Sequence, residues 1–208
     1  VHDDIKIGLP TRDQYIENYK TTLKNLAKFG VKVVTYNFMP IFDWTRTDLF
    51  HPLEDGSNAL YYEKSKIQDD YKEMAEYILK NLHGKTFPGW EPERMAKLDE
   101  LFEAYRPVTK EKLWENLQYF LEAIMPTCHE TGIKMAIHQD DPPWDIFGIP
   151  RLLCDKESIG RFLHMVDDEY NCLCLCSGSL GANMENNVAD IIRTYCDRIA
   201  FAHIRNLR

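Results

Sequence analysis

The sequence predicts an α/β protein whose strands form a parallel sheet. Short runs of apolar and β-branched residues, bounded by turn-forming residues, are typical of buried strands. Stretches long enough for a helix separate most of these runs, and a repeated strand–helix unit indicates parallel pairing. The runs lie at 31–38, 133–138, 171–176 and 199–205. An eight-stranded (β/α)₈ barrel of the TIM type takes about 250 residues. The 208 residues therefore predict a partial barrel of about four strand–helix units plus a long helical insertion.

The chain is expected to begin with a helix that leads into the first strand. Residues 12–29 place apolar side chains at the 3.6-residue period of an amphipathic helix. Thr11 is placed to cap this helix and Gly30 to end it. The β-branched run at 31–38 then predicts the first strand, which ends just before Pro40.

The connection after the first strand is unusually long. Residues 40–57 are aromatic, charged and proline-bearing, which indicates a loop, and residues 58–108 predict two helices broken around 83–92. Long connections at the carboxyl end of a strand are commonly lids or binding loops. We therefore expect residues 40–110 to form a loop and helical insertion that serves as a lid, and a helical face over 58–82 to support a homodimer.

The second half of the chain alternates regularly between helices and strands. A helix over 109–131 is expected, capped by Thr109 and stopped by Gly132. Because no linker-like stretch divides the chain, residues 1–208 are expected to form a single domain. The remaining elements are predicted as strand 133–138, an irregular proline-rich loop, helix 155–168, strand 171–176, helix 184–197 and strand 199–205.

Composition excludes several functional classes. A net charge of −8 argues against a nucleic-acid or anionic-membrane surface, because phosphate binding requires clustered Lys and Arg. No apolar run approaches the roughly 20 residues of a membrane span, and the first residues lack the pattern of a signal peptide. The six cysteines are scattered or alternate along one strand, which favours reduced thiols in a cytoplasmic protein.

Three potential metal ligands fall at equivalent positions of successive strands. His138, Cys176 and His203 each lie at the end of an apolar run. Because the carboxyl ends of parallel barrel strands meet on one face, these side chains are expected to converge there. Two imidazoles and a thiolate can hold a divalent transition metal. A single histidine at such a position is more often a core or rim residue, so the prediction depends on all three together. Cys172 and Cys174 are expected to be small buried residues of the same strand.

Charged residues near these strand ends are candidates for catalysis and substrate binding. Asp140 and Asp141 follow His138 directly, where they could orient a ligand or act on a substrate, or form only a solvated acidic turn. Arg46 and Arg205 are candidate carboxylate clamps, because guanidinium binds a carboxylate through two parallel hydrogen bonds. The glycine-bearing stretch after Cys176 opens a helix whose backbone N–H groups could meet an anion.

Several long motifs together resemble the mannonate dehydratase family. The opening of the chain is similar to the same family, and the resemblance runs through essentially the whole sequence. It implies a metal-dependent barrel of the xylose-isomerase-like type. It also implies conversion of D-mannonate to 2-dehydro-3-deoxy-D-gluconate and water in hexuronate catabolism, with Mn²⁺ or Fe²⁺ as the metal. The motifs are YNFMPIFDWTRTDL (36–49), AIHQDDPPWDIFGIPR (136–151), CSGSLGANMEN (176–186) and FAHIRN (201–206).

The resemblance also assigns the metal ligands and exposes two departures. The family's ligands map onto His138, Cys176 and His203, the residues that strand position indicates. The family continues into a strand with an Arg-Pro-Asp-His-Gly type motif whose aspartate completes the metal site, and this segment is absent from the sequence. Gln139 stands where the family usually has proline. Ligand softness alone would favour zinc or iron over manganese.

We therefore expect a lyase that dehydrates a sugar acid. Asn37, Arg46 and Arg205 would position the acid, while Asp140 or Asp141 supports catalysis. A metal-dependent sugar isomerase on the same barrel is the alternative enzyme, since a fold and a cation do not fix the reaction. An inactive fragment with a binding or assembly role is the alternative from a different class.

Overall fold

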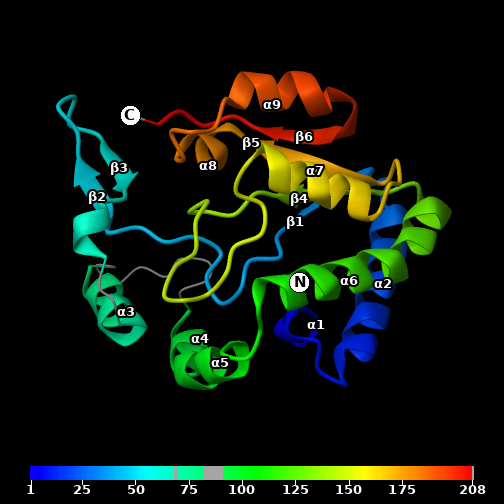
Figure 1. Cartoon of the computed structure of the whole chain (residues 1–208), viewed down its shortest axis with the longest axis horizontal. Coiled ribbons are helices and arrows are strands. Elements are labelled where there is room, and N and C mark those ends of the chain that lie inside the picture. Colours follow the sequence, from blue (N-terminus) through cyan, green and yellow to red (C-terminus); the bar gives the residue numbers. More distant parts are fainter. Residues whose placement is uncertain (68–69, 82–90, 208) are drawn as a thin grey trace.

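The computed structural model describes residues 1–67, 70–81 and 91–207, and in it the four predicted strands form one parallel sheet. The strands lie side by side in chain order, so each connection returns the chain to the next position of the sheet (Figure 1). The α/β class and the parallel half-barrel sheet are thus as predicted. The strands are β1 Val33–Tyr36, β4 Lys134–His138, β5 Asn171–Cys176 and β6 Ile199–His203.

The centre of this sheet is more buried than its edges. All six residues of β5 are buried, as are the three central residues of β4. Strands buried on both faces are typical of parallel sheets and explain the continuous apolar runs in the sequence. Cys172 and Cys174 are buried in β5 as predicted. At the edge of the sheet, β6 leaves its last three residues exposed.

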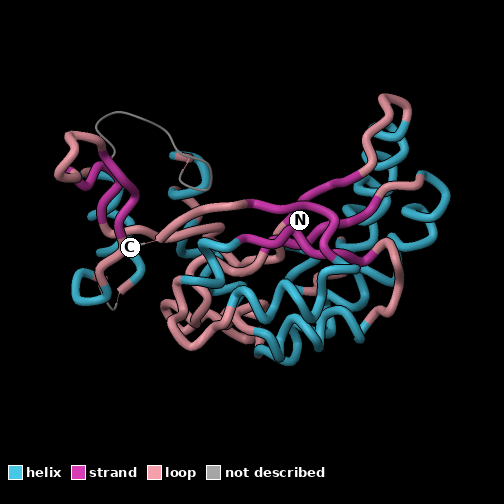
Figure 2. Tube along the Cα trace, turned by 90° about the horizontal axis from the view of Figure 1, so that it is seen from above, coloured by secondary structure: helices cyan, strands magenta, loops and turns pink. Residues whose placement is uncertain are grey.

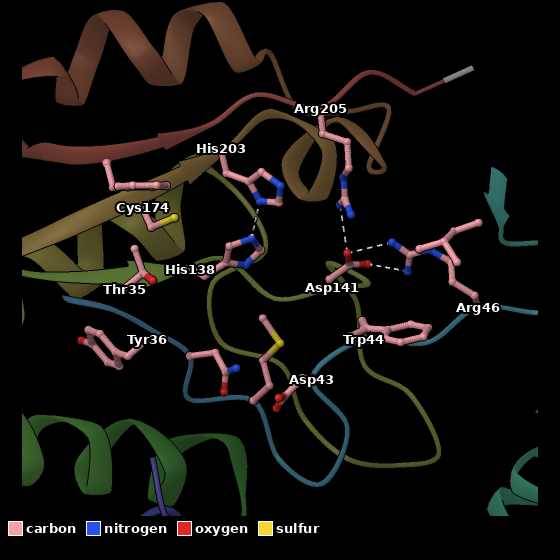
Figure 3. A pocket seen from close by; sticks show the side chains of 14 residues that line it. Thr35, Tyr36, Asp43, Trp44, Arg46, His138, Asp141, Cys174, His203 and Arg205 are labelled. Atoms are coloured by element: carbon pink, nitrogen blue, oxygen red, sulfur yellow. Dashed lines mark hydrogen bonds and ion pairs between the residues drawn. The ribbon is translucent and has the colours of Figure 1, made fainter. Parts of the chain in front are cut away.

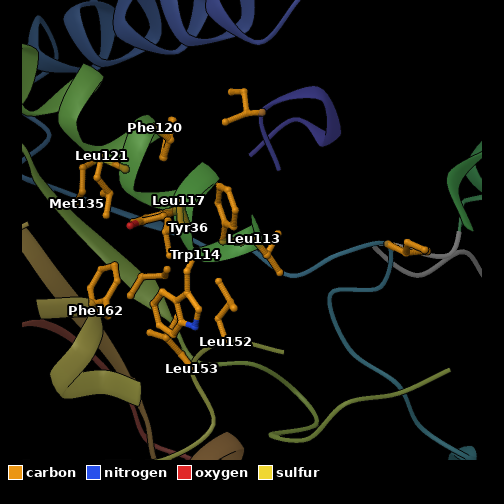
Figure 4. Close-up of a cluster of buried hydrophobic side chains, with 14 of the residues drawn as sticks. Tyr36, Leu113, Trp114, Leu117, Phe120, Leu121, Met135, Leu152, Leu153 and Phe162 are labelled. Atoms are coloured by element: carbon orange, nitrogen blue, oxygen red, sulfur yellow. The ribbon is translucent and has the colours of Figure 1, made fainter. Parts of the chain in front are cut away.

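Helices cover one side of the sheet (Figure 2). The long helix α6 (Lys110–Thr131) directs Trp114 and Phe120 into the core, where they lie with Met135 of β4 and Phe162 of α7 (Figure 4). None of the helices within the described ranges is both long and apolar enough to cross a membrane. The other helices of the repeated units are α2 Arg12–Ala27, which packs on α6, α7 Lys156–Met165 and α9 Val188–Tyr195.

Capping residues account for most of the helix boundaries. The Thr109 hydroxyl accepts a hydrogen bond from the Lys112 N–H at 3.1 Å, and Gly132 ends α6 with a left-handed φ of 66°, as predicted. Asp155 caps α7 through Ser158 in a reciprocal capping box. Thr11 does occupy the N-cap of α2, but its hydroxyl donates to Asp4 and does not cap the helix.

The connection after β1 differs from the prediction, because it contains an antiparallel hairpin. Strand β2 (Asp48–Pro52) pairs with β3 (Asn58–Tyr61), where a loop and the start of a helix were expected. The turn between them is built from Asp55, which accepts a hydrogen bond from the Ser57 N–H at 3.0 Å, and from Gly56 with φ 82°. The hairpin projects from one end of the molecule (Figure 1). Cross-strand pairing here overrides the helix-favouring composition.

The rest of this connection is helical, as expected, but in short pieces. The helix predicted at the start of the 58–82 face is replaced by β3, so this range does not form a continuous helical surface. The predicted break around 83–92 falls almost entirely outside the described residues. The helices of the connection are α3 Tyr71–Lys80, α4 Pro92–Met95 and α5 Leu98–Tyr105, and a short helix, α1 Asp3–Ile7, precedes α2.

Candidate functional site

The carboxyl ends of β1, β4, β5 and β6 open into a pocket of about 590 Å³ (Figure 3). Its lining includes His138 and His203 from the strand ends, and Arg46, Asp141 and Arg205 from the loops that follow strands. In a parallel sheet of this type the loops after the strands form the site. The pocket is therefore the candidate functional site of the described chain.

The three predicted ligands come together at one edge of this pocket, where His138 and His203 line it and Cys176 is buried beside them. His138, Cys176 and His203 are the last residues of β4, β5 and β6, and Cys176 and His203 are direct partners in the β5–β6 register. One ligand atom from each lies within 4.8 Å of the other two. His138 Nε2 and His203 Nδ1 are 3.3 Å apart. We call these three residues the imidazole–thiolate cluster.

The electrostatics of this cluster favour a charged sulfur. Burial raises the pKa of Cys176, but hydrogen bonds from His138 and Ser179 outweigh it and bring the pKa down to about 6. Burial lowers the pKa of His138, yet the sulfur of Cys176 and the Gln139 carbonyl raise it above its usual value. The cluster therefore combines a thiolate with an imidazole that holds its proton more firmly than usual.

Gln139 holds two of these ligands at once. Its backbone carbonyl lies 2.7 Å from His138 Nδ1, and its side-chain Oε1 accepts a hydrogen bond from the Cys176 N–H at 2.8 Å. The last residue pair of the β4–β5 ladder is His138 and Cys174. Beyond it, the side-chain carbonyl of Gln139 accepts the Cys176 N–H in place of a backbone carbonyl of β4. Sequence reasoning treated Gln139 only as a replacement for proline and gave it no such role.

The two adjacent aspartates have different surroundings. Asp140 is 4% exposed and does not line the pocket; its carboxylate accepts the N–H groups of Leu152 and Leu153 at 3.0 and 2.7 Å. Burial raises its pKa, although Arg151 at 3.6 Å and these N–H groups oppose the shift. Asp140 thus ties the proline-rich loop together, whereas Asp141 alone of the predicted pair faces the pocket.

Asp141 joins the two predicted arginine clamps. Arg46 donates to both of its oxygens at 2.8 Å, and Arg205 Nη2 donates to Oδ2 at 2.9 Å. Burial raises the pKa of Asp141, but the hydrogen bonds and charges of Arg46 and Arg205 hold it below its usual value. Two guanidinium groups against one carboxylate leave a formal charge of +1, which favours an anion. We call these three residues the arginine cluster.

The stretch after Cys176 directs a backbone N–H group toward the Cys176 sulfur. It forms the short helix α8 (Ser177–Gly181), and the Ser179 N–H donates to Cys176 Sγ at 3.4 Å. Gly178 lies against the Arg205 guanidinium, and a Cβ at this position would overlap it. One N–H group at the start of this helix thus faces the Cys176 sulfur, and the absence of a side chain at Gly178 leaves room for Arg205.

Other residues from the segment after β1 complete the pocket. Asn37, predicted to bind substrate, does line it. Asp43 and Trp44 line it as well, and sequence reasoning did not single them out. The signal available for them was the position of the FDWTR stretch directly after a strand end, where functional loops are concentrated.

Comparison with known proteins identifies a family that the sequence matches. The sequence matches the family described as D-mannonate dehydratase (UxuA) over residues 1–208. The chain belongs to this family. It is 58% identical to the mannonate dehydratase of Endomicrobium trichonymphae over 209 residues and 55% identical to that of Shouchella clausii. These alignments cover 100% of this chain but 57% and 58% of the two relatives.

A solved structure of the mannonate dehydratase family has the same fold. It is the crystal structure of the mannonate dehydratase from Streptococcus suis serotype 2, with a TM-score of 0.81 and 44% identity. The match covers 98% of this chain and 53% of that one. The chain therefore spans a little over half the length of the relatives it matches.

The imidazole–thiolate cluster fits the metal that the mannonate dehydratase family implies. Its donors are two imidazoles and a thiolate whose pKa is already lowered, which is a set that binds divalent transition metals. The ring of His138 is oriented by a backbone carbonyl through its other nitrogen, as is usual for metal-binding histidines.

Proposed function

We propose that this chain carries the metal-binding and acid-binding part of a D-mannonate dehydratase. In this proposal D-mannonate is converted to 2-dehydro-3-deoxy-D-gluconate and water, as one step of hexuronate catabolism in the cytoplasm. The observation that carries it is one pocket with the imidazole–thiolate cluster on one side and the positive arginine cluster on the other. Family membership over the whole chain supports the same reaction.

The arginine cluster would bind the carboxylate of the sugar acid. Asp141 uses both oxygens to hold Arg46, so the free N–H groups of Arg205 and the net positive charge are left for a ligand. Arg205 is also the more exposed of the two, with 29% of its side chain accessible against 10% for Arg46. Asn37 lines the same pocket and would bind another polar group of the acid.

The imidazole–thiolate cluster would hold Mn²⁺ or Fe²⁺ through His138, Cys176 and His203. When bound, such a cation supplies Lewis-acid stabilisation of negative charge on oxygen. Dehydration removes the proton beside the carboxylate and expels the neighbouring hydroxyl as water, so negative charge develops on the carboxylate side. Arg205 would stabilise that charge, because Asp141 orients its guanidinium before substrate binds, and the charge of Arg46 would add to the positive field.

The experiment is incubation of D-mannonate with the Mn²⁺-loaded or Fe²⁺-loaded protein, followed by mass spectrometry. A product lighter by one water molecule is expected, and its NMR spectrum should show a 2-keto-3-deoxy acid. The matched control is the same protein treated with a chelator, which should give no product.

The same measurement distinguishes the alternatives. An isomer of unchanged mass would identify the sugar isomerase instead, and the absence of any product from the loaded chain would contradict the proposed activity of this chain. Binding of D-mannonate without turnover would then assign the chain a role in ligand binding.

A further inference from the structure

A carboxylate that the proposed mechanism does not use faces the same pocket. Asp43 and Asp141 are the acidic side chains among the described lining residues. Asp141 is fully engaged by Arg46 and Arg205. Asp43 is only partly buried, and it takes part in no hydrogen bond among the described residues, although the charges of Lys6 and the Val1 amino group act on it. It also lies outside the group whose ligand atoms converge at the imidazole–thiolate cluster. Asp43 is therefore available to a ligand in the pocket.

The turn that precedes Asp43 has an unusual backbone. Ile41 has a φ of 57°, a left-handed conformation that β-branched residues rarely adopt. The N–H of Phe42 donates to the carbonyl of Pro40 at 2.6 Å, which closes a tight three-residue turn. Strained backbone persists only where the surrounding structure enforces it, and such sites are concentrated at ligand-binding positions.

Two positively charged side chains, Lys6 and Arg94, hold the backbone carbonyl groups of this turn. Lys6, which is 3% exposed, donates to the carbonyl of Met39 at 2.8 Å. Arg94 of α4 donates through Nε to the carbonyl of Ile41 at 3.1 Å. Asp3 pairs with both side chains, since its carboxylate lies 3.5 Å from Lys6 Nζ and 3.4 Å from Arg94 Nη1. A buried lysine is costly unless it is paired in this way.

The same lysine couples electrostatically to Asp43. Burial lowers the pKa of Lys6, and the charges of Asp3 and Asp43 oppose that shift. Asp43 faces the pocket (Figure 3), while Lys6 and Arg94 bind the carbonyl groups of Met39 and Ile41 in the turn before it. The backbone just before Asp43 is thus held in place before a ligand arrives.

We propose that Asp43 binds hydroxyl groups of the sugar acid and thereby selects polyhydroxy acids over simple carboxylic acids. A free carboxylate is an acceptor only, so it suits a ligand with several O–H donors. Hydrogen bonds between a hydroxyl and a charged carboxylate are among the stronger ones. The inference rests on the proposed function, because it takes its ligand class from D-mannonate.

Whether removal of the Asp43 charge weakens or tightens ligand binding tests this assignment. Calorimetry would measure the Kd for D-mannonate, in the presence of Mn²⁺, for the unchanged protein and for Asp43→Asn. Removing a negative charge from a pocket that binds an anion should by itself tighten binding. The loss of charge-assisted hydrogen bonds to hydroxyl groups should instead weaken it, by about tenfold or more. Weaker binding supports the assignment, and equal or tighter binding overturns it.

Two controls keep the result specific. Asp55→Asn removes the same charge from the exposed hairpin turn and should leave the Kd unchanged. Hexanoate has the carboxylate and chain length of the sugar acid but no hydroxyl groups, so Asp43→Asn should not weaken its binding. An equal loss of affinity for hexanoate would overturn the assignment, because it would point to a general change of the pocket.

The positioning role of Lys6 is tested in the same assay. Lys6→Met should weaken D-mannonate binding more than hexanoate binding, and Lys6→Arg should restore most of the loss. Equal losses for both ligands would overturn that role. If the unchanged protein bound no D-mannonate at all, the proposed function would fail together with this inference. If it bound D-mannonate but Asp43→Asn made no difference, only the inference would fail.

Discussion

The two sides of the pocket are built on different electrostatic principles. In the arginine cluster every charge meets an opposite charge within 2.9 Å, and the group is held by three side-chain hydrogen bonds to Asp141. In the imidazole–thiolate cluster one sulfur with a lowered pKa faces two imidazoles, and the pKa of His138 is raised in turn. The first cluster keeps an excess positive charge that favours an anion, whereas the second brings together the donors that a metal cation would bind.

The largest expected effect comes from opening the arginine cluster. Asp141→Asn would leave the buried Arg46 without its carboxylate, and breaking a buried ion pair on one side costs about 3–5 kcal/mol of unfolding free energy. Urea unfolding at neutral pH measures this loss of unfolding free energy. Asp167→Asn breaks the exposed pair with Arg198 and should cost less than about 1 kcal/mol. Similar values for both variants would show that the arginine cluster is not a structural unit.

A substitution in the imidazole–thiolate cluster should change the metal affinity and leave the free energy of unfolding nearly unchanged. Cys176→Ser replaces the soft ligand, so the Kd for Co²⁺ or Mn²⁺ should rise by about a hundredfold or more while the fold is kept. Cys174→Ser is the matched control on the same strand and should cost about 1–3 kcal/mol of stability with little change in metal affinity. Unchanged metal content in both variants would make Cys176 only another buried cysteine.

A smaller effect is expected where Gln139 supports the cluster. Gln139→Met keeps the size of the side chain but removes the acceptor for the Cys176 N–H, so metal affinity should fall about tenfold. The thiolate-to-metal absorption of the Co²⁺-loaded protein should shift in the same variant. Gln139→Glu retains an acceptor oxygen and should recover most of the affinity. An unaltered spectrum and Kd in Gln139→Met would contradict the role of this hydrogen bond.

The smallest expected effect is a change with pH in the stabilisation that Asp141 gives the arginine cluster. The folded-state pKa of Asp141 is lowered, so its stabilisation is present above the unfolded value of about 3.9 and is lost as the pH falls through the lower folded value. The free-energy difference between the unchanged protein and Asp141→Asn should therefore be constant from neutral pH to about pH 5 and should shrink only in more acid solution. Urea unfolding across this range would refute the assignment if the difference did not shrink.

Sequence reasoning predicted the sheet and the ligand positions because both depend on local patterns. Apolar runs with turn residues at their ends mark β4, β5 and β6, and parallel pairing then brings His138, Cys176 and His203 to one edge. The hairpin of β2 and β3 was missed because its strands are only five and four residues long. Their pairing is fixed by contacts between strands, such as the stacked rings of His51 and Tyr61, and not by periodicity.

The different roles of Asp140 and Asp141 could not be predicted from their order. Both residues lie in an irregular loop, where the direction of a side chain depends on distant partners and not on a repeating backbone. Asp140 turns toward the backbone N–H groups of Leu152 and Leu153, while Asp141 turns toward Arg46, ninety-five residues away in the sequence. The contribution of Gln139 likewise depends on where the β4–β5 ladder stops.

Cys176 lies where β5 ends and α8 begins, and its sulfur and its backbone N–H are each held by a hydrogen bond. Among the described residues, the ring of His203 is held only through its Nδ1, which lies 3.3 Å from His138 Nε2. The sulfur is therefore the fixed point of the three donors, and His203 is the one with room to adjust. Ions of different radius would then be accommodated by a small shift of the His203 side of the site, so discrimination between first-row metals by size would be weak.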